Sequence, residues 1–153
     1  EAMIPQQRRV AVLGGVRIPH TRGIVAHSDG DVLLHALVDA LLGAAGLGDI
    51  GQHFPDTDPQ WRGADSGRFV SHALQLLTGR GQRVLNADLT LLAQTPRIGP
   101  WRDEIRRNIA VKLALTEACV NLKATTPEHL GFLGRGEGLA AMATVLIDEI
   151  KAD

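Results

Sequence analysis

The chain has 153 residues, of which 44% are hydrophobic and 3% aromatic, and its formal net charge is −1. A domain of this length can bury a substantial core, whereas the scattered basic residues and the absence of tyrosine argue against a nucleic-acid partner. No apolar run approaches the roughly 20 residues that span a bilayer, so we expect no membrane partner either.

The first half of the chain predicts two strands and two helices. Residues 8–18 (RRVAVLGGVRI) favour a strand, a turn at Gly14-Gly15 and the start of a second strand. Residues 31–45 have the apolar spacing of a helix, and residues 65–81 predict another. Between these helices, residues 46–63 are rich in Gly, Pro and Asp, and loops of this length are often functional.

The second half predicts further strands and helices. Its expected elements are a strand at 83–94, a helix at 101–115, a strand at 119–126, a helical turn at 127–130, a glycine-rich loop at 131–138 and a last segment at 139–150. β-Branched residues favour a strand over a helix for that last segment. The elements together predict a single α/β domain.

Cys119 is the only cysteine, which excludes an internal disulfide and is typical of a reducing compartment. Its place in a predicted strand favours an inert buried thiol. The first residues lack the charged-then-apolar layout of a signal peptide. We therefore expect a cytoplasmic protein, or a plastid one if the source is a plant.

Two histidines and three aspartates lie within residues 27–39, around the start of the first helix. Ser28 or Asp29 can cap the helix, and Asp31 falls in its first turn, where a negative charge suits the dipole, so one or two of the aspartates are explained. His35 has Asp31 and Asp39 four residues away on either side, and a carboxylate beside an imidazole can orient a ligand histidine. His35 is therefore either a structural histidine or a metal ligand, and His27 could contact an anion near the helix start. One histidine with carboxylates is too few ligands for a complete zinc site.

Residues 124–138 (ATTPEHLGFLGRGEG) form a second candidate cluster. Thr126, Pro127 and Glu128 have the pattern of an N-cap, a proline at the first helical position and an acid in the first turn. Such a helix start can receive phosphate oxygens, or it can simply be a well-capped short helix. Glycines around Arg135 would let the backbone approach a ligand that the guanidinium binds.

The loop DIGQHFPDTDP, residues 49–59, is a third candidate. Asp56 and Asp58 could bind sugar hydroxyls or make local turns with their own backbone. The sequence contains no Walker loop, dinucleotide fingerprint, serine nucleophile elbow or CxxC motif.

Taken together, the stretches GGVRIP, AHSDGDVLLHALVDALLGAAGLGDIG, FPDTDPQWRGADS, KATT and LGFLGRGEG resemble the 2-C-methyl-D-erythritol 2,4-cyclodiphosphate synthase family of the non-mevalonate isoprenoid pathway. The likeness runs in register from Leu13 to Ile147. It implies a mixed β-sheet packed against helices, in a homotrimer with active sites between subunits. It also implies a phosphorus–oxygen lyase that cyclises 4-diphosphocytidyl-2-C-methyl-D-erythritol 2-phosphate and releases CMP. Zn²⁺ and Mg²⁺ (or Mn²⁺) are the implied cofactors.

The resemblance assigns roles to individual positions. His27 and Thr126 stabilise the transition state, His35 binds zinc with support from Asp31 and Asp39, and Glu128 lies near the second metal. The erythritol-phosphate loops are 49–51 and 54–58, the cytidine loop is 93–99, and the diphosphate site is 125–128. The implied substrate contacts are His27, Ser28, Asp49, Ile50, Gly51, Phe54, Pro55, Asp56, Thr57, Asp58, Ala93, Gln94, Thr95, Pro96, Arg97, Ile98, Gly99, Thr125, Thr126, Pro127, Glu128, Phe132 and Arg135. Arg135, with Glu137, is also expected to face a central trimer cavity that can hold an isoprenoid diphosphate.

The sequence departs from the family pattern in three places. Pro127 replaces the usual threonine and Arg97 the usual lysine. An Asp-x-His motif that supplies two further zinc ligands is absent, although residues 1–12 resemble the loop that follows it. We therefore interpret residues 1–153 as the synthase domain without the strand that carries Asp-x-His, with a fused cytidylyltransferase domain upstream as a further option. The alternative is a true loss of the ligands, which would leave a weakened enzyme or a non-catalytic trimer that binds cytidine nucleotides or isoprenoid diphosphates. A metal-dependent phosphohydrolase is a third, weaker hypothesis.

Overall fold

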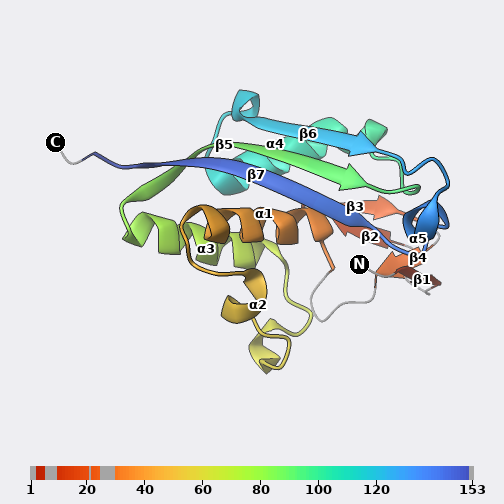
Figure 1. Cartoon of the computed structure of the whole chain (residues 1–153), viewed down its shortest axis with the longest axis horizontal. Helices are drawn as coiled ribbons and strands as arrows, with labels where there is room; N and C mark the ends of the chain where they lie inside the picture. Colours follow the sequence, from red (N-terminus) through yellow and green to blue (C-terminus); the bar gives the residue numbers. More distant parts are fainter. Residues whose placement is uncertain (1–2, 6–9, 21, 25–29, 152–153) are drawn as a thin grey trace.

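The computed structural model describes residues 3–5, 10–20, 22–24 and 30–151. A three-stranded sheet in the order β6-β5-β7 forms one layer, and its strands are Gln82–Leu92 (β5), Val120–Thr125 (β6) and Ala140–Glu149 (β7). Three helices cover one face of this sheet (Figure 1), namely α1 (Val32–Ala44), α3 (Gly67–Gly79) and α4 (Arg102–Leu113). The predicted single α/β domain is confirmed.

The sheet is mixed, as the family resemblance implied. Strand β5 pairs in parallel with β6 and antiparallel with β7. Helix α4 provides the crossover that parallel neighbours require. Because β5 and β6 run in the same direction, the loops that follow them leave the same edge of the sheet. The residues between 139 and 150 form a strand, as their β-branched content predicted.

Strand β5 contains one irregularity. Its pairing with β7 shifts between Val84 and Asn86, which places a β-bulge there. Val84 is buried before the bulge, and Ala87, Leu89 and Leu91 are buried after it. The predicted alternation of the strand is therefore confirmed on either side of the bulge but not across it.

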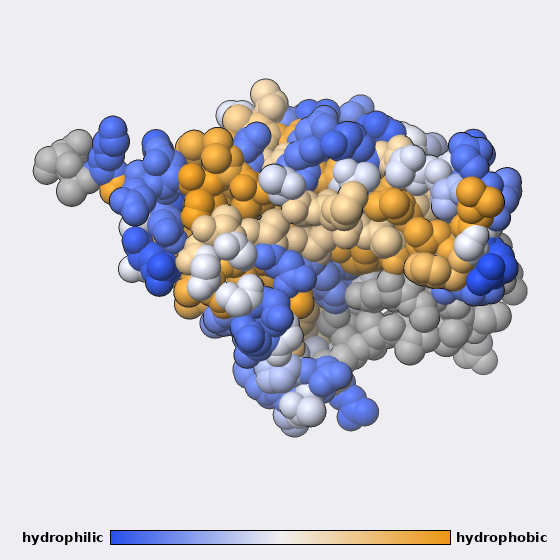
Figure 2. Space-filling model, in the orientation of Figure 1, coloured by the Kyte–Doolittle hydropathy of each residue, from blue (hydrophilic) through white to orange (hydrophobic). Residues whose placement is uncertain are grey.

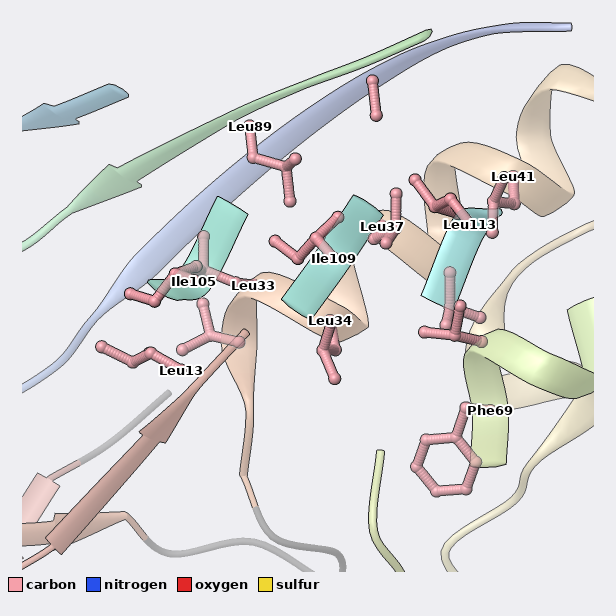
Figure 3. Close-up of a cluster of buried hydrophobic side chains, with 14 of the residues drawn as sticks. Leu13, Leu33, Leu34, Leu37, Leu41, Phe69, Leu89, Ile105, Ile109 and Leu113 are labelled. Atoms are coloured by element: carbon pink, nitrogen blue, oxygen red, sulfur yellow. The ribbon is translucent and has the colours of Figure 1, made fainter. Parts of the chain in front are cut away.

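The core lies between the sheet and the helices. Helix α1 is buried along most of its length, and its five leucines are all fully buried: Leu33, Leu34, Leu37, Leu41 and Leu42. Figure 3 shows the first four of these side chains near Leu89 of the sheet and Ile109 of α4. Burying each such side chain contributes roughly 1.5–3 kcal/mol relative to exposure, so the apolar side of α1 anchors the helix that carries the first candidate cluster.

Smaller elements complete the fold. Two antiparallel pairs are formed by β1 (Met3–Pro5) with β4 (Arg22–Ile24) and by β2 (Val10–Leu13) with β3 (Val16–Pro19), and the second pair is a hairpin. Two four-residue helices are α2 (Ile50–His53) and α5 (Gly131–Gly134), and three short 3₁₀ turns lie at Pro59–Trp61, Gly99–Trp101 and Glu117–Cys119. Within the described ranges, no helix has the length and apolarity needed to cross a bilayer.

Cys119 differs from its prediction. It ends a 3₁₀ turn just before β6 rather than lying in the strand, and its side chain is half-buried. The Thr116 hydroxyl contacts its sulfur at 3.5 Å. The exposure of this thiol is therefore set by the 3₁₀ turn and not by the alternating burial of the residues in β6.

Candidate active site

Asp31 fixes the start of α1. Its carboxylate is fully buried and accepts the backbone N–H of Leu34 at 3.0 Å, which makes Asp31 the N-cap rather than the first-turn residue that we predicted. The same carboxylate accepts the N–H groups of Gly14 at 2.9 Å and Gly15 at 2.7 Å. Both glycines have positive φ, as a tight two-residue hairpin turn requires. One buried carboxylate therefore joins the β2–β3 turn to the first turn of α1.

His35 lies one turn into α1, and its Nε2 is 2.9 Å from the hydroxyl of Ser66. Ser66 is fully buried and immediately precedes α3. The ring of Phe69 lies 5.9 Å from the imidazole, centroid to centroid. These contacts hold the imidazole in a defined orientation, which the structural and the ligand interpretations both require. Sequence reasoning missed Ser66, because its partner lies 31 residues away.

Asp39 positions the next loop. Its carboxylate accepts the N–H of Ile50 at 2.8 Å, which attaches the first residue of α2 to α1. Asp49 caps α2 through a capping box with Gln52. Gly51 and the Asp49 side chain are exposed beside this cap, so the candidate residues 49–51 are held by local hydrogen bonds at the surface.

The segment 54–58 is anchored by aromatic packing. Phe54 is buried, with ring centroids of Phe69 at 4.6 Å and Trp61 at 4.9 Å. Asp58 accepts the N–H of Gln60 at 3.1 Å, so it makes the local turn that was one of its two predicted roles. Asp56 and Thr57 are exposed between these two anchors, and Pro55 is half-buried. Because Phe69 contacts both Phe54 and His35, one aromatic cluster supports the loop and the histidine.

The other candidate residues gather where β5 and β6 end. A cleft of about 460 Å³ is lined by residues from both loops, among them Ala93, Pro96, Arg97, Ile98, Gly99, Thr125 and Thr126. The N–H of Ala93 donates to the carbonyl of Thr125 at 3.2 Å. The predicted cytidine loop and the predicted diphosphate site thus form one continuous surface.

The loop 126–130 corrects one prediction. No helical turn forms at 127–130; Glu128 and His129 instead have positive φ of 55° and 61°, and the short helix α5 starts only at Gly131. The hydroxyl of Thr126 donates to the Glu128 carboxylate at 3.3 Å. The amide oxygen of Gln94 accepts the N–H of His129 at 2.9 Å. This cross-loop hydrogen bond helps to hold a left-handed backbone that local capping rules do not predict.

Two further contacts border this region. His20 Nε2 lies 3.0 Å from the hydroxyl of Thr95, which connects the residue after β3 to the loop after β5. Arg135 forms an ion pair with Glu137 at 2.7 Å, and this hydrogen-bonded carboxylate raises the pKa of the guanidinium. Phe132 remains 55% exposed nearby. The region therefore combines a permanent cation with an open aromatic surface.

The predicted residues form two groups in the described chain. His35 and the loops 49–51 and 54–58 surround α1 and α2, while 93–99 and 125–128 lie at the sheet edge. His27 and Ser28 lie outside the described residues. Within the described ranges, no three His, Cys, Asp or Glu side chains gather as a metal-binding group. The assignments of His35 and Glu128 as metal ligands remain predictions.

The chain is similar in sequence to a known protein family and to named relatives. The sequence model of the YgbB family matches residues 3–148. A 2-C-methyl-D-erythritol 2,4-cyclodiphosphate synthase from Thioalkalivibrio sulfidiphilus is 58% identical over 137 residues, which covers 90% of this chain and 86% of that protein. The synthase of the same name from Xanthomonas campestris is 55% identical over 141 residues, or 92% of this chain and 86% of that protein.

Solved structures agree. The bifunctional IspDF from Campylobacter jejuni superposes with a TM-score of 0.90 at 42% identity; the match covers 97% of this chain but only 40% of that longer one. A CDP-bound structure of 2C-methyl-D-erythritol-2,4-cyclodiphosphate synthase gives a TM-score of 0.86 at 40% identity, with 96% of this chain and 94% of that chain covered. The fold and the sequence therefore point to the same relatives.

Proposed function

The chain belongs to the YgbB family, and we propose that it is a cyclodiphosphate synthase that converts 4-diphosphocytidyl-2-C-methyl-D-erythritol 2-phosphate to 2-C-methyl-D-erythritol 2,4-cyclodiphosphate and CMP. In this reaction an oxygen of the 2-phosphate attacks the β-phosphorus, and the bond from that phosphorus to the CMP oxygen breaks. No water is consumed. The observation that carries the proposal is the shared cleft of the 93–99 and 125–128 loops, in a chain 58% identical to a named synthase.

The sheet-edge cleft suits a cytidine diphosphate group. Backbone groups of the loop 93–99 would contact the base, and the hydroxyls of Thr125 and Thr126 would contact phosphate oxygens. Arg97 lines the same cleft and adds a cation. Gln94 would keep both loops in this arrangement through its hydrogen bond to His129. Positioning and charge stabilisation of this kind supply most of the catalysis in phosphoryl transfer.

The other group of residues suits the erythritol phosphate. Asp56 and Thr57 are exposed, on a loop that Phe54 anchors by packing against Phe69. The carboxylate of Asp56 would accept hydrogen bonds from sugar hydroxyls. His27 would contact the phosphate, as the family resemblance implies.

Metals belong to the proposal. His35 offers an imidazole nitrogen of the kind that Zn²⁺ prefers, and Ser66 would orient it. Glu128 offers the carboxylate oxygen that Mg²⁺ or Mn²⁺ prefers, held by Thr126. The donor types fit, while the remaining zinc ligands would come from outside the described residues. When bound, the metals would orient the diphosphate and neutralise its charge.

A homotrimer completes the proposal. The outer face of the sheet carries hydrophobic residues along β7 (Figure 2), including Met142 at 61% and Leu146 at 57% exposure. An apolar surface of this kind is typical of a contact between proteins. Assembly through this face would bring the two residue groups of neighbouring subunits together and would place Phe132 and Arg135 near a central cavity for an isoprenoid diphosphate.

Phosphorus NMR tests the reaction directly. The chain is incubated with the CDP-linked substrate, Zn²⁺ and Mg²⁺ in oxygen-18 water, and equimolar CMP and unlabelled cyclic diphosphate are expected. Labelled phosphate would instead support a phosphohydrolase, and binding of cytidine diphosphate without turnover would support the non-catalytic alternative. Thr126→Val should lower kcat by about 100- to 1,000-fold, since it removes one donor to developing charge. Val111→Ala, at an exposed position of α4, should leave kcat unchanged.

A further inference from the structure

A second cleft lies between α3 and α4, next to the aromatic cluster that supports the loop 54–58. Its volume is about 540 Å³. Its lining comes from Trp61 and Asp65 before α3, from the exposed side of α3, and from Lys112 on α4. None of these positions is a predicted substrate or metal contact, so the proposed synthase chemistry leaves this cleft unexplained.

Lys112 is held in an unusual place for a cation. Its side chain is half-buried and crosses two glycines: a Cβ on Gly15 would lie 3.2 Å from Lys112 Cε, and one on Gly67 would lie 3.2 Å from Lys112 Nζ. The ammonium thus sits beside the first residue of α3, where the helix end carries positive partial charge. In the described parts of the chain Lys112 forms no ion pair, and the carboxylate of Asp65, which lines the same cleft, accepts the N–H of Gly67 at 2.7 Å.

The rest of the cleft also presents donors. The guanidinium of Arg68 lies 5.0 Å from the Trp61 ring centroid, and among the described residues it has no carboxylate partner. Ser71 and Gln75 add a hydroxyl and an amide one and two turns into α3. The lining therefore combines two cations with the neutral groups of Ser71 and Gln75, the imidazole of His72 and one carboxylate, that of Asp65.

We propose that the cleft between α3 and α4 binds the phosphate or diphosphate group of a small molecule through Lys112 and Arg68. Arginine can grip two phosphate oxygens at once, while lysine contributes a point charge. An anion there would also relieve the unfavourable position of the Lys112 ammonium beside the helix start. The volume suits a small ligand, and the scattered charges elsewhere on the chain do not favour a nucleic acid. This site is independent of the proposed synthase reaction.

Trp61 provides the readout. The chain contains two tryptophans, so Trp101→Phe leaves Trp61, in the cleft, as the only one. This variant is titrated with inorganic pyrophosphate at constant ionic strength, without added metal. We expect a saturable change in Trp61 fluorescence. Lys112→Met and Arg68→Gln should each weaken the binding by about tenfold or more, since each removes a charge-assisted contact.

Two controls make the test specific. Arg80→Gln removes an exposed arginine beyond the end of α3 and should leave the titration unchanged. Arg97→Gln weakens the sheet-edge cleft and should also leave it unchanged, whereas Lys112→Arg should retain binding if the charge is what matters. Circular dichroism confirms that each variant is folded. An unsaturable response, or a response that Arg97→Gln removes and Lys112→Met does not, would overturn the proposal.

Discussion

Replacement of Asp31 by alanine tests the most connected carboxylate in the fold. The N-cap hydrogen bond to Leu34 contributes about 1 kcal/mol. The bonds from Gly14 and Gly15 are charge-assisted, and each contributes about 1.5 kcal/mol or more. Their loss should lower the free energy of unfolding by about 4 kcal/mol. At a denaturant slope of about 2 kcal/mol per molar, the urea midpoint should fall by roughly 2 M.

The assay is urea unfolding followed by far-UV circular dichroism at fixed protein concentration. Asp49→Ala is the matched control, since Asp49 caps α2 but is exposed and makes no contact with a distant turn in the described chain. Its cost should be about 1 kcal/mol or less. If Asp31→Ala costs no more than Asp49→Ala, the carboxylate is only a helix cap, and the inferred connection between hairpin and helix is refuted.

Three further predictions concern the core, the sheet surface and the 126–130 loop. Leu89→Ala should lower the free energy of unfolding by about 2–5 kcal/mol, measured in urea, because it empties a fully buried site. Hydrogen bonds, the largest effect being that of Lys123, lower the pKa of Asp88 below its ordinary 3.8. The ionised Asp88 side chain therefore stabilises the fold above about pH 4, and this stabilisation is lost as the pH falls through the lowered pKa. Asp88→Asn should reduce the pH dependence of the unfolding free energy between about pH 5 and 2, by about 1 kcal/mol at most because the pair is exposed. Gly134→Ala would drive a Cβ into the backbone of His129, and it should reduce cyclodiphosphate formation by about tenfold or more in the phosphorus NMR assay.

Each of these predictions has a control in the same chain. Val111→Ala truncates a side chain that is 77% exposed and should change stability by about 0.5 kcal/mol or less. Gly43→Ala adds a Cβ to α1 where no atom lies within 4 Å, and it should raise stability by about 0.5–1 kcal/mol. Asp56→Asn removes an exposed carboxylate that forms no ion pair within the described ranges, and it should leave the pH dependence of the unfolding free energy unchanged. If a control variant had an effect as large as the variant it is paired with, the cited contact would not be the cause of that effect.

Periodic patterns predicted much of the fold, because burial acts on each residue locally. The Gly14-Gly15 turn, the helix around His35 and the last strand followed from spacing and residue type alone. The Thr126–Glu128 pattern misled us, since it is the ordinary signal of a helix start. A contact from Gln94, 35 residues away from His129, accompanies the left-handed backbone at this point instead. Local propensity cannot register a hydrogen bond of that range.

In the candidate site, too, local residue types were predicted from the sequence and long-range contacts were not. Its residue types were evident in the sequence, and the resemblance to a known family assigned their roles. Ser66 and the aromatic support of the loop 54–58 were not predicted, because both depend on α3 packing against α1. Residues that act through others, such as Ser66 on His35, leave no spacing of their own in a sequence.

The bulge in β5 also governs where this chain can change in length. Val84, with an even residue number, faces the core, whereas Leu89 and Leu91, with odd numbers, also face it. The inward-facing positions of β5 therefore shift by one residue, at Leu85. Loss of Leu85 would restore regular alternation and keep every other side chain on its present face. A one-residue deletion farther along the strand would turn buried leucines toward solvent. Single-residue deletions among relatives should therefore occur at Leu85, because only there does the loss of one residue leave the buried side chains of β5 facing the core.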